Sequence, residues 1–239
     1  MNGILDTLQK LYKSFYNAIV PEQRYLAYIE GLKMTLLISL LAVLLGVIIG
    51  LIVAVIKVAA KGSGNPVLKF FSGVCNVYTT VIRGTPAMLQ VLLIYNIVFT
   101  SPTVSKIAVG AVCFGVNSGA YVAEIFRAGI ESVPKGQMQA GRSLGLSYIK
   151  TMRLIIIPQA IKNILPALGN EFITMVKETS VISVLAVNDL MKMAQYIGSR
   201  TWDIIPPLVI AGIIYLIITL GLTKLQGLLE RRLAKSDRR

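Results

Sequence analysis

The sequence predicts an all-α integral membrane protein with about five transmembrane helices and a helical cytoplasmic loop between the third and the fourth. Of its 239 residues, 55% are hydrophobic and 15% are charged, whereas a soluble domain is roughly 45–50% apolar and about a quarter charged. Uncharged runs of roughly 20 residues recur, which is the length of a helix that crosses the hydrocarbon core. One long basic, helix-forming stretch lies between such runs and predicts a surface outside the membrane.

The first expected element is an amphipathic lead-in over residues 1–30. Leu5, Leu8 and Leu11 recur at helical spacing beside Lys10 and Lys13, which predicts a helix lying on the outer membrane surface. A lead-in helix that faces solvent is the alternative. The segment has no compact apolar core followed by a small-residue cleavage site, so we do not expect a cleavable signal.

A transmembrane domain is expected over residues 31–226, with spans at residues 34–56, 78–100, 107–127, 165–187 and 204–224. Most of these ranges are uncharged over their central part. The fourth is the least hydrophobic, because Glu171, Lys177 and Glu178 interrupt it. A loop over residues 135–158 joins the third span to the fourth, and residues 227–239 form a basic tail.

The distribution of Lys and Arg orients these spans. With the N-terminus outside and the C-terminus in the cytoplasm, fifteen basic residues fall on the inner side and seven on the outer side. Basic residues are retained on the cytoplasmic side, so this orientation is expected. The net charge of +13 then reflects topology and contact with the anionic lipid of the bilayer, and no nucleic-acid partner is needed to explain it.

Several kinds of chemistry lack the residues that they need. The chain has no histidine and two cysteines without a CxxC spacing, so we expect no zinc or haem site. It also has no GxxxxGK[ST] phosphate loop, so we expect no nucleotide hydrolysis by its own residues. We therefore predict no bound cofactor and no enzymatic activity.

The loop over residues 135–158 has the pattern of a rigid docking surface. Gln139, Ala140 and Gly141 place small residues early in a helix, where another surface can approach closely. Gly145 is expected to end that helix, and Pro158 to let a second helix start in a new direction. Two short helices at an angle can transmit a rigid-body movement from a cytosolic partner.

This pattern resembles the cytoplasmic EAA signature of ABC importer permeases, in which EAA is followed by three residues, Gly, nine residues and I-x-L-P. Here the same spacing joins Gln139, Ala140 and Gly141 to Gly145 and Pro158, with Gln in place of Glu and Gly in place of the second Ala. The resemblance implies that these residues, together with Arg142, form a coupling helix that docks on an ATP-binding cassette subunit.

Four further blocks resemble the permeases that take up polar amino acids such as histidine, arginine, glutamine and glutamate. They are VIRGTPAMLQ (81–90), NSGAYVAEIFRAGIESVPKGQ (117–137), PQAIKNILPALGNEFI (158–173) and KETSVIS (177–183). The resemblance implies a type I importer permease in a bacterial cell membrane, a second permease subunit in a homo- or heterodimer, and an extracytoplasmic amino-acid-binding protein. It also implies that ATP is bound by the partner subunit. Which amino acid is carried stays open.

Polar groups within the fourth predicted span are candidates for the substrate path. Glu171, Thr174 and Glu178 are spaced i, i+3 and i+7 and so share one helical face. Ionisable groups at bilayer depth cost at least ~2.5–3.5 kcal/mol on insertion scales. Glu178 could bind the substrate's ammonium group or cationic or amide side chain, or it could form a salt bridge that serves packing or gating.

In the third span, Asn117 and Tyr121 share a face with Glu124. Asn117 and Tyr121 can hydrogen-bond a substrate in a wet cavity, and Asn117 can equally bridge two helices. Glu124 and Arg127 are three residues apart, and we expect them to pair near the inner interface as a structural contact.

The sequence RGTP at residues 83–86 interrupts the second span. Pro86 removes a backbone donor and is expected to kink or break the helix. Arg83 beside a restarted helix N-terminus suits a substrate carboxylate, while a structural kink with Arg83 at the lipid headgroups is the alternative. Thr80 and Gln90 flank the break and are candidates for lining the path.

The leading hypothesis is a permease subunit of an ATP-driven importer for polar amino acids. A self-sufficient secondary transporter is the alternative, although we find no internal repeat and five spans do not divide into matching halves. An intramembrane enzyme has no histidine, metal cluster or paired-Asp arrangement to support it.

Overall fold

The computed structural model describes residues 2–61, 63–99 and 104–235. Residue 1 of the expected lead-in, residue 100 of the second expected span and residues 236–239 of the basic tail lie outside this part. Within the described residues the protein is helical throughout, which confirms the all-α prediction. The α-helices are α1 (Asn2–Ile19), α2 (Arg24–Ala60), α3 (Pro66–Gly84), α4 (Ala87–Val98), α5 (Lys106–Glu131), α6 (Lys135–Ser143), α7 (Tyr148–Thr151), α8 (Ile157–Glu178), α9 (Leu190–Thr201) and α10 (Ile205–Lys235), with short 3-10 or π segments η1 (Pro21–Gln23), η2 (Met152–Ile156) and η3 (Thr179–Leu185).

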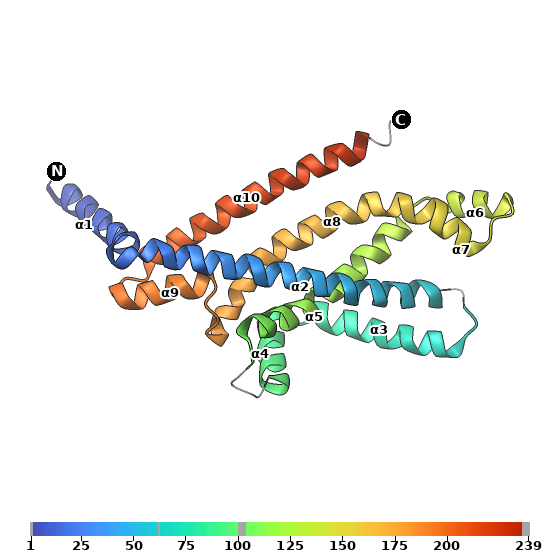
Figure 1. Ribbon diagram of the computed structural model, residues 1–239, viewed down its shortest axis with the longest axis horizontal. Helices are drawn as coiled ribbons and strands as arrows, with labels where there is room; N and C mark the ends of the chain where they lie inside the picture. Colours follow the sequence, from blue (N-terminus) through green and yellow to red (C-terminus); the bar gives the residue numbers. More distant parts are fainter. Residues whose placement is uncertain (1, 62, 100–103, 236–239) are drawn as a thin grey trace.

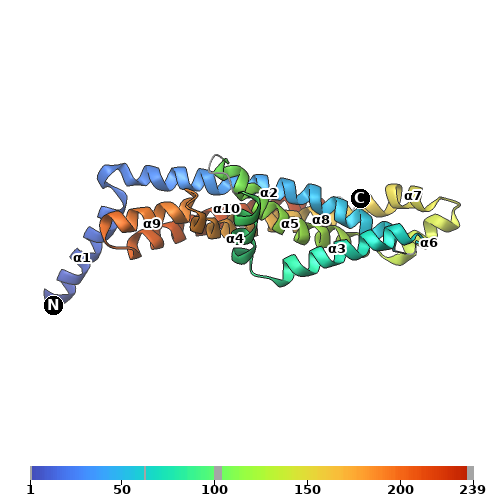
Figure 2. The same cartoon turned by 90° about the horizontal axis from the view of Figure 1, so that it is seen from below.

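The long helices run along one axis of an elongated bundle (Figures 1 and 2). Helices α6 and α7 project from one end, and α1 and α9 lie at the other. Three described helices are long and apolar enough to cross a membrane, in the ranges 21–60, 106–131 and 205–232, and α3 with α4 makes a fourth if the pair is one span. Helix α8 is not among them, in keeping with the low hydrophobicity of the fourth predicted span, and the total of five stays a prediction.

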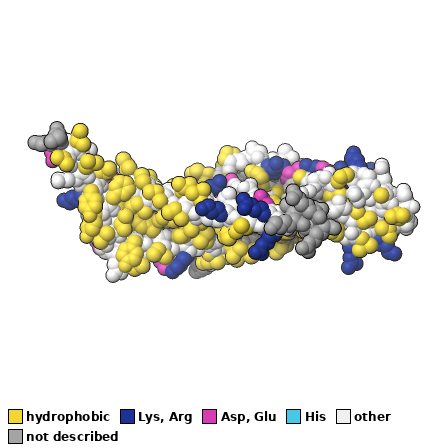
Figure 3. Space-filling view, turned by 90° about the horizontal axis from the view of Figure 1, so that it is seen from above, with side chains coloured by type: hydrophobic (Ala, Val, Ile, Leu, Met, Phe, Trp, Pro, Cys, Tyr) yellow, Lys and Arg dark blue, Asp and Glu magenta, His cyan; other side chains and the backbone are white. Residues whose placement is uncertain are grey.

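The balance of hydrophobic and basic side chains on the surface changes along the same axis. Figure 3 shows hydrophobic side chains covering most of the end that carries α1, whereas most Lys and Arg side chains in this view lie toward the other end. Helix α10 exposes large apolar side chains on its outer face, including Leu216, Ile217 and Leu220 at 57%, 62% and 53%. Such a surface is suited to lipid or to other membrane helices rather than to water.

The second predicted span is broken. Helix α3 ends at Gly84, Pro86 precedes α4, and the two helices are bent by 116°. The buried Gln90 side chain repairs the break, since its Nε2 donates to the carbonyl oxygens of Ile82 and Thr85 at 2.7 and 3.0 Å. The prediction that Pro86 kinks or breaks the helix is confirmed, and residues 78–99 therefore belong to two differently directed helices.

Helices α2 and α5 form the most extensive helix pair in the bundle, and glycines permit their close approach. Gly46 and Gly50 of α2 are spaced as a G-x-x-x-G and face Ser118 and Val122 of α5. A Cβ atom on Gly46 would lie 2.7 Å from Ser118 Oγ, and one on Gly50 would lie 2.6 Å from Val122 Cγ1. Small residues at these positions are thus a steric requirement of the packing.

We expect Gly50→Ala to destabilise the protein by about 1–3 kcal/mol, because the added methyl group overpacks the α2–α5 contact. The matched control is Gly212→Ala in α10, where a Cβ meets nothing within 4 Å and a glycine-to-alanine change favours a helix. Thermal unfolding of both purified variants in one detergent measures the effect. Equal midpoints for the two variants would contradict this account of the packing.

One expectation about the loop is wrong. Pro158 does not start a second helix in a new direction, because the chain is helical without interruption from Tyr148 through η2 into α8. The π-helical segment Met152–Ile156 widens the turn just before Pro158, which lies in the first turn of α8, where its missing N–H is tolerated. The change of direction occurs earlier, at Gly145, whose φ of +80° is a left-handed conformation suited to glycine.

Candidate functional site

A cavity of about 450 Å³ lies between α3, α5 and α8, and we call it the central cavity. Its polar lining residues are Arg83 of α3, Tyr121 and Glu124 of α5, Ser132 directly after α5, and Asn163, Asn170 and Glu171 of α8. Arg83, Tyr121 and Glu171 are predicted path residues that are far apart in the sequence. The fold brings them to one cavity with both signs of charge and several hydrogen-bonding groups.

The Arg83 guanidinium group is held loosely. Its Cζ lies 5.6 Å from the centre of the Tyr121 ring in a cation–π contact. Its nearest carboxylate oxygen is Glu124 Oε2, at 4.0 Å from Nη1, which is beyond hydrogen-bond distance. Arg83 therefore keeps N–H groups that can donate hydrogen bonds to a carboxylate in the cavity.

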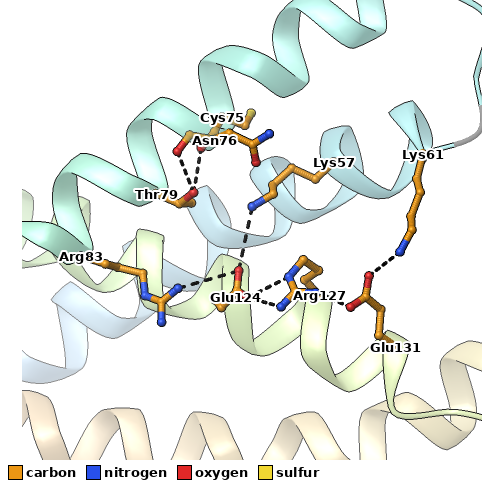
Figure 4. A network of polar contacts seen from close by, with 9 residues as sticks. All are labelled: Lys57, Lys61, Cys75, Asn76, Thr79, Arg83, Glu124, Arg127 and Glu131. Carbon is orange, nitrogen blue, oxygen red and sulfur yellow. Dashed lines mark hydrogen bonds and ion pairs between the residues drawn. The ribbon is translucent and has the colours of Figure 1, made fainter.

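Glu124 joins three helices through charge (Figure 4). Its Oε1 accepts a hydrogen bond of 2.8 Å from Arg127 Nε, which confirms the expected pair. Its Oε2 lies 3.9 Å from Lys57 Nζ of α2, in addition to the contact with Arg83 of α3. Arg127 also bonds Glu131, which accepts a 2.7 Å bond from Lys61. Glu124 is thus more than a local structural partner, because it links α2, α3 and α5 at the cavity wall.

Glu171 is 8% exposed and accepts a hydrogen bond of 2.7 Å from Ser118 Oγ of α5. Sequence reasoning missed Ser118, although it follows directly after Asn117 in α5. The sequence carries no signal for it, because the contact between Ser118 and Gly46 of α2 depends on how the two helices pack. The pair ties α8 to α5 and leaves the carboxylate at the cavity surface.

Asn117 and Gln90 are in contact with each other, and together they stabilise the break between α3 and α4. Asn117 Nδ2 donates to Gln90 Oε1 at 2.8 Å, and both side chains are buried. Gln90 in turn bonds the end of α3, including the Thr85 hydroxyl at 2.7 Å. Neither residue lines the central cavity. This geometry fits the alternative in which Asn117 bridges two helices.

The remaining predicted path residues lie around the central cavity rather than in its lining. Thr80 lines a neighbouring open cavity that it shares with Arg83 and Glu124. Thr174 and Glu178 follow Glu171 along α8 by one and two turns, and both are half-buried. Within the described part of the chain, the Glu178 side chain makes no hydrogen bond or salt bridge. The described residues also contain no group of His, Cys, Asp or Glu side chains that could hold a metal ion.

Residues 135–156, which comprise α6, α7 and η2, form a projection that we call the foot. Gly141 is buried where α6 packs on α7, and a Cβ there would lie 2.5 Å from Thr151 Cγ2. The Arg142 guanidinium donates from Nη1 to the Leu146 carbonyl oxygen at 3.1 Å, which closes the turn at Gly145. These bonds make the foot a compact unit.

The outer surface of the foot is apolar and basic. Leu144, Ile149 and Leu154 are 81%, 76% and 62% exposed. Arg142 and Lys150 are exposed among them, as are the predicted docking residues Gln139, Ala140 and Pro158. Exposed large apolar side chains at the end of a membrane bundle, ringed by polar groups, mark a protein interaction site.

The chain is similar to proteins with known roles. A family model described as "Binding-protein-dependent transport system inner membrane component" matches residues 46–235. The arginine transport system permease protein ArtQ of Bacillus subtilis is 35% identical over 227 residues, which cover 93% of this chain and 98% of that protein. A putative glutamine transport system permease protein of Rickettsia bellii is 38% identical over 218 residues, covering 89% and 95%.

Solved structures agree. The crystal structure of an amino acid ABC transporter with histidines contains a chain that superposes with a TM-score of 0.79 at 46% identity, over 86% of this chain and 94% of that one. The methionine ABC transporter MetNI, in an inward-facing form, superposes with a TM-score of 0.68 at 16% identity, over 88% and 99%. The second likeness concerns the fold alone.

The helical bundle, with helices long and apolar enough to cross a membrane, and its likeness to the matching proteins place the chain in the class of ABC importer permeases. The chain belongs to the family of binding-protein-dependent transport system inner membrane components. It is the permease subunit of an ABC importer, in which ATP hydrolysis takes place on a separate subunit. This confirms the predicted class over the self-sufficient secondary transporter.

Proposed function

We propose that this permease carries a polar amino acid across a bacterial cell membrane, with the central cavity as the site that the amino acid occupies in transit. The observation that supports the proposal is the loosely held Arg83 guanidinium in the same cavity as the carboxylates of Glu124 and Glu171. A free amino acid has one carboxylate and one ammonium group, and this cavity offers a partner of the opposite sign for each. The transport systems named for the similar permeases carry arginine and glutamine.

Each group in the cavity has a role in this proposal. Arg83 binds the substrate carboxylate, exchanging its distant contact with Glu124 for direct hydrogen bonds. Glu171 accepts from the substrate ammonium while Ser118 holds its carboxylate in place. The ring of Tyr121 helps to hold the Arg83 guanidinium in place through the cation–π contact. The substrate side chain extends toward Asn170, and its contacts there determine which side chains the cavity accepts.

The assembly that we propose has the N-terminus outside and the C-terminus in the cytoplasm. The foot then reaches the cytosol and docks on the ATP-binding cassette subunit, while a binding protein delivers substrate at the end that carries α9. A second permease subunit, identical or homologous, completes the path. The charge distribution along the bundle supports this orientation.

Transport follows from a shift between two states. ATP binding closes the motor subunits, the foot moves with them as a unit, and α8 carries that movement toward the cavity because it continues directly from η2. A shift from about 1:99 to 99:1 requires about 5.5 kcal/mol of differential binding. ATP binding at two motor subunits is the source of that free energy.

The proposal is tested by reconstituting the permease with its ATPase and binding protein in liposomes and measuring uptake of a panel of labelled amino acids. We expect ATP-dependent uptake of at least one polar amino acid, inhibited by excess of the same unlabelled compound. The control omits ATP from the vesicles. Saturable uptake of a sugar or an inorganic ion, with none of any amino acid, would overturn the proposal.

Glu178 is a second candidate for substrate contact, since it lacks a partner within the described chain. We expect Glu178→Gln to lower uptake by about tenfold, which corresponds to ~1.4 kcal/mol, while the complex still assembles. Assembly is checked by size-exclusion chromatography. Wild-type transport kinetics in the variant would remove Glu178 from the substrate path and leave Glu171 as the carboxylate of α8.

A further inference from the structure

A second pocket lies at the end of the bundle nearer to the foot, between the C-terminal end of α2, the N-terminal half of α3 and the C-terminal end of α5. Its volume is about 360 Å³. Four basic side chains line it: Lys57 of α2, Lys61 directly after the end of α2, Lys69 of α3 and Arg127 of α5. We call it the rim pocket.

The rim pocket has more positive charge than its acids neutralise. Glu131 is the one acidic side chain in its lining, and it bonds both Lys61 and Arg127. Lys57 has Glu124 at 3.9 Å, a carboxylate already shared with two arginines. The Lys69 side chain forms no hydrogen bond or ion pair with any described residue. One lysine charge in the pocket therefore lacks an acidic partner, and a second, on Lys57, shares its carboxylate with Arg83 and Arg127.

Helix α3 separates this polar pocket from an apolar surface. Lys69, Ser72 and Asn76 recur at helical spacing and line the pocket. The neighbouring positions Phe70 and Val77 are 68% and 63% exposed. A ligand at this place meets cations and hydroxyl or amide groups beside a helix surface that is suited to hydrocarbon.

We propose that the rim pocket binds the phosphate headgroup of an anionic phospholipid from the inner leaflet. Basic pockets between transmembrane helices on the cytoplasmic side bind such headgroups. The side chains of Lys69 and Lys57 bind the phosphate, and Ser72 and Asn76 supply further donors. The acyl chains extend along the exposed apolar face of α3.

The occupant is a lipid rather than a soluble anion because of where the pocket lies. It is at the C-terminal end of α2, which is long and apolar enough to span the bilayer; this is the inner end in the orientation proposed above, and the inference rests on that orientation. The pocket lies beside apolar side chains of α3 that a soluble phosphate would leave in contact with water. A lipid satisfies the cations and covers these side chains at the same time. Its headgroup would also fix α2 to α3 and α5 at the level of the Glu124 network.

The test uses the full complex purified in detergent and stripped of lipid. Native mass spectrometry and the thermal unfolding midpoint are followed while phosphatidylglycerol or phosphatidylcholine is added. We expect phosphatidylglycerol to bind about tenfold more tightly than phosphatidylcholine and to raise the midpoint. Lys69→Gln should weaken phosphatidylglycerol binding about fivefold, in line with the effect of one basic residue near an anionic lipid, and Lys69→Glu should weaken it further.

Lys224→Gln is the matched control. It removes the same charge from an exposed position in the C-terminal half of α10, outside the rim pocket. This variant should bind phosphatidylglycerol as tightly as the wild type does. Lys69 has no internal partner, so its variants should fold normally. Equal binding of the two lipids, wild-type binding by Lys69→Glu, or displacement of the lipid by glycerol phosphate at equal affinity would each overturn the proposal. The result is independent of which solute the permease carries.

Discussion

Arg83→Gln is expected to raise the KM for uptake by about 10- to 100-fold. A hydrogen bond to a charged group contributes about 1.5–3 kcal/mol, and glutamine keeps a donor but loses the charge that attracts the carboxylate. Because the Arg83 guanidinium lies at 4.0 Å from its nearest acid, its removal breaks no tight internal ion pair. The defect should therefore appear in substrate affinity and leave the stability of the complex nearly unchanged.

Arg200→Gln is a matched control for this experiment. Arg200 also lies over a tyrosine ring, with its Cζ 5.4 Å from the centre of Tyr196, but it belongs to α9 and is remote from the central cavity. Each variant loses a cation–π contact and one positive charge, and Arg200→Gln also loses the hydrogen bonds that Nε and Nη2 donate to Tyr196 Oη at 3.0 and 2.8 Å. Uptake kinetics that change equally in both would show that Arg83 has no special relation to the substrate.

Replacing Gly145 by valine is expected to uncouple ATP hydrolysis from uptake. The residue has a φ of +80°, a conformation in which a β-branched side chain is a true outlier. A Cβ there meets no atom within 4 Å, so the cost comes from the backbone alone. The turn between α6 and α7 should open, and movement of the motor should reach α8 weakly. We expect uptake to fall at least about tenfold while ATP hydrolysis continues.

Gly136→Val tests whether the effect belongs to that conformation. Gly136 lies in the same foot, and a Cβ there also meets nothing within 4 Å, but its φ is negative. Arg142→Glu should resemble Gly145→Val, because it removes the bond to the Leu146 carbonyl and reverses the charge of the docking surface. The ratio of ATP hydrolysed to solute imported is the measurement. An unchanged ratio in both Gly145→Val and Arg142→Glu would mean that the motor docks elsewhere.

The sequence predicted features that depend on local chemistry. Pro86 had to kink or break a helix, and it breaks one. Glu124 and Arg127 are three residues apart on one helix and had to meet. The foot was predictable as a unit because Gly145 ends α6 in a left-handed turn. Its second half was not, since nothing in the local pattern indicated the π-helical turn that lets α7 run into α8 across Pro158.

The composition of the cavity required the three-dimensional fold. Spacing along α8 placed Glu171 and Glu178 on one face, yet the cavity is lined by Glu171 and not by Glu178. The sequence predicts Glu124 only as the partner of Arg127. In the fold, α2 and α3 also place Lys57 and Arg83 near its second carboxylate oxygen. Contacts between helices depend on the register in which they pack, and a single sequence does not state that register.

In the proposed mechanism the foot transmits the movement of the separate ATPase subunit to the central cavity. The most direct test places a cysteine at Leu144, which is 81% exposed on the foot, and cross-links it to the ATPase subunit through a reducible linker in the assembled complex. Cys75 and Cys113 are buried and are replaced to exclude background. We expect the cross-link between the foot and the ATPase subunit to form and to stop uptake. Uptake should resume when the linker is reduced. No cross-link at Leu144 in a complex that still imports its solute with ATP would contradict the claim.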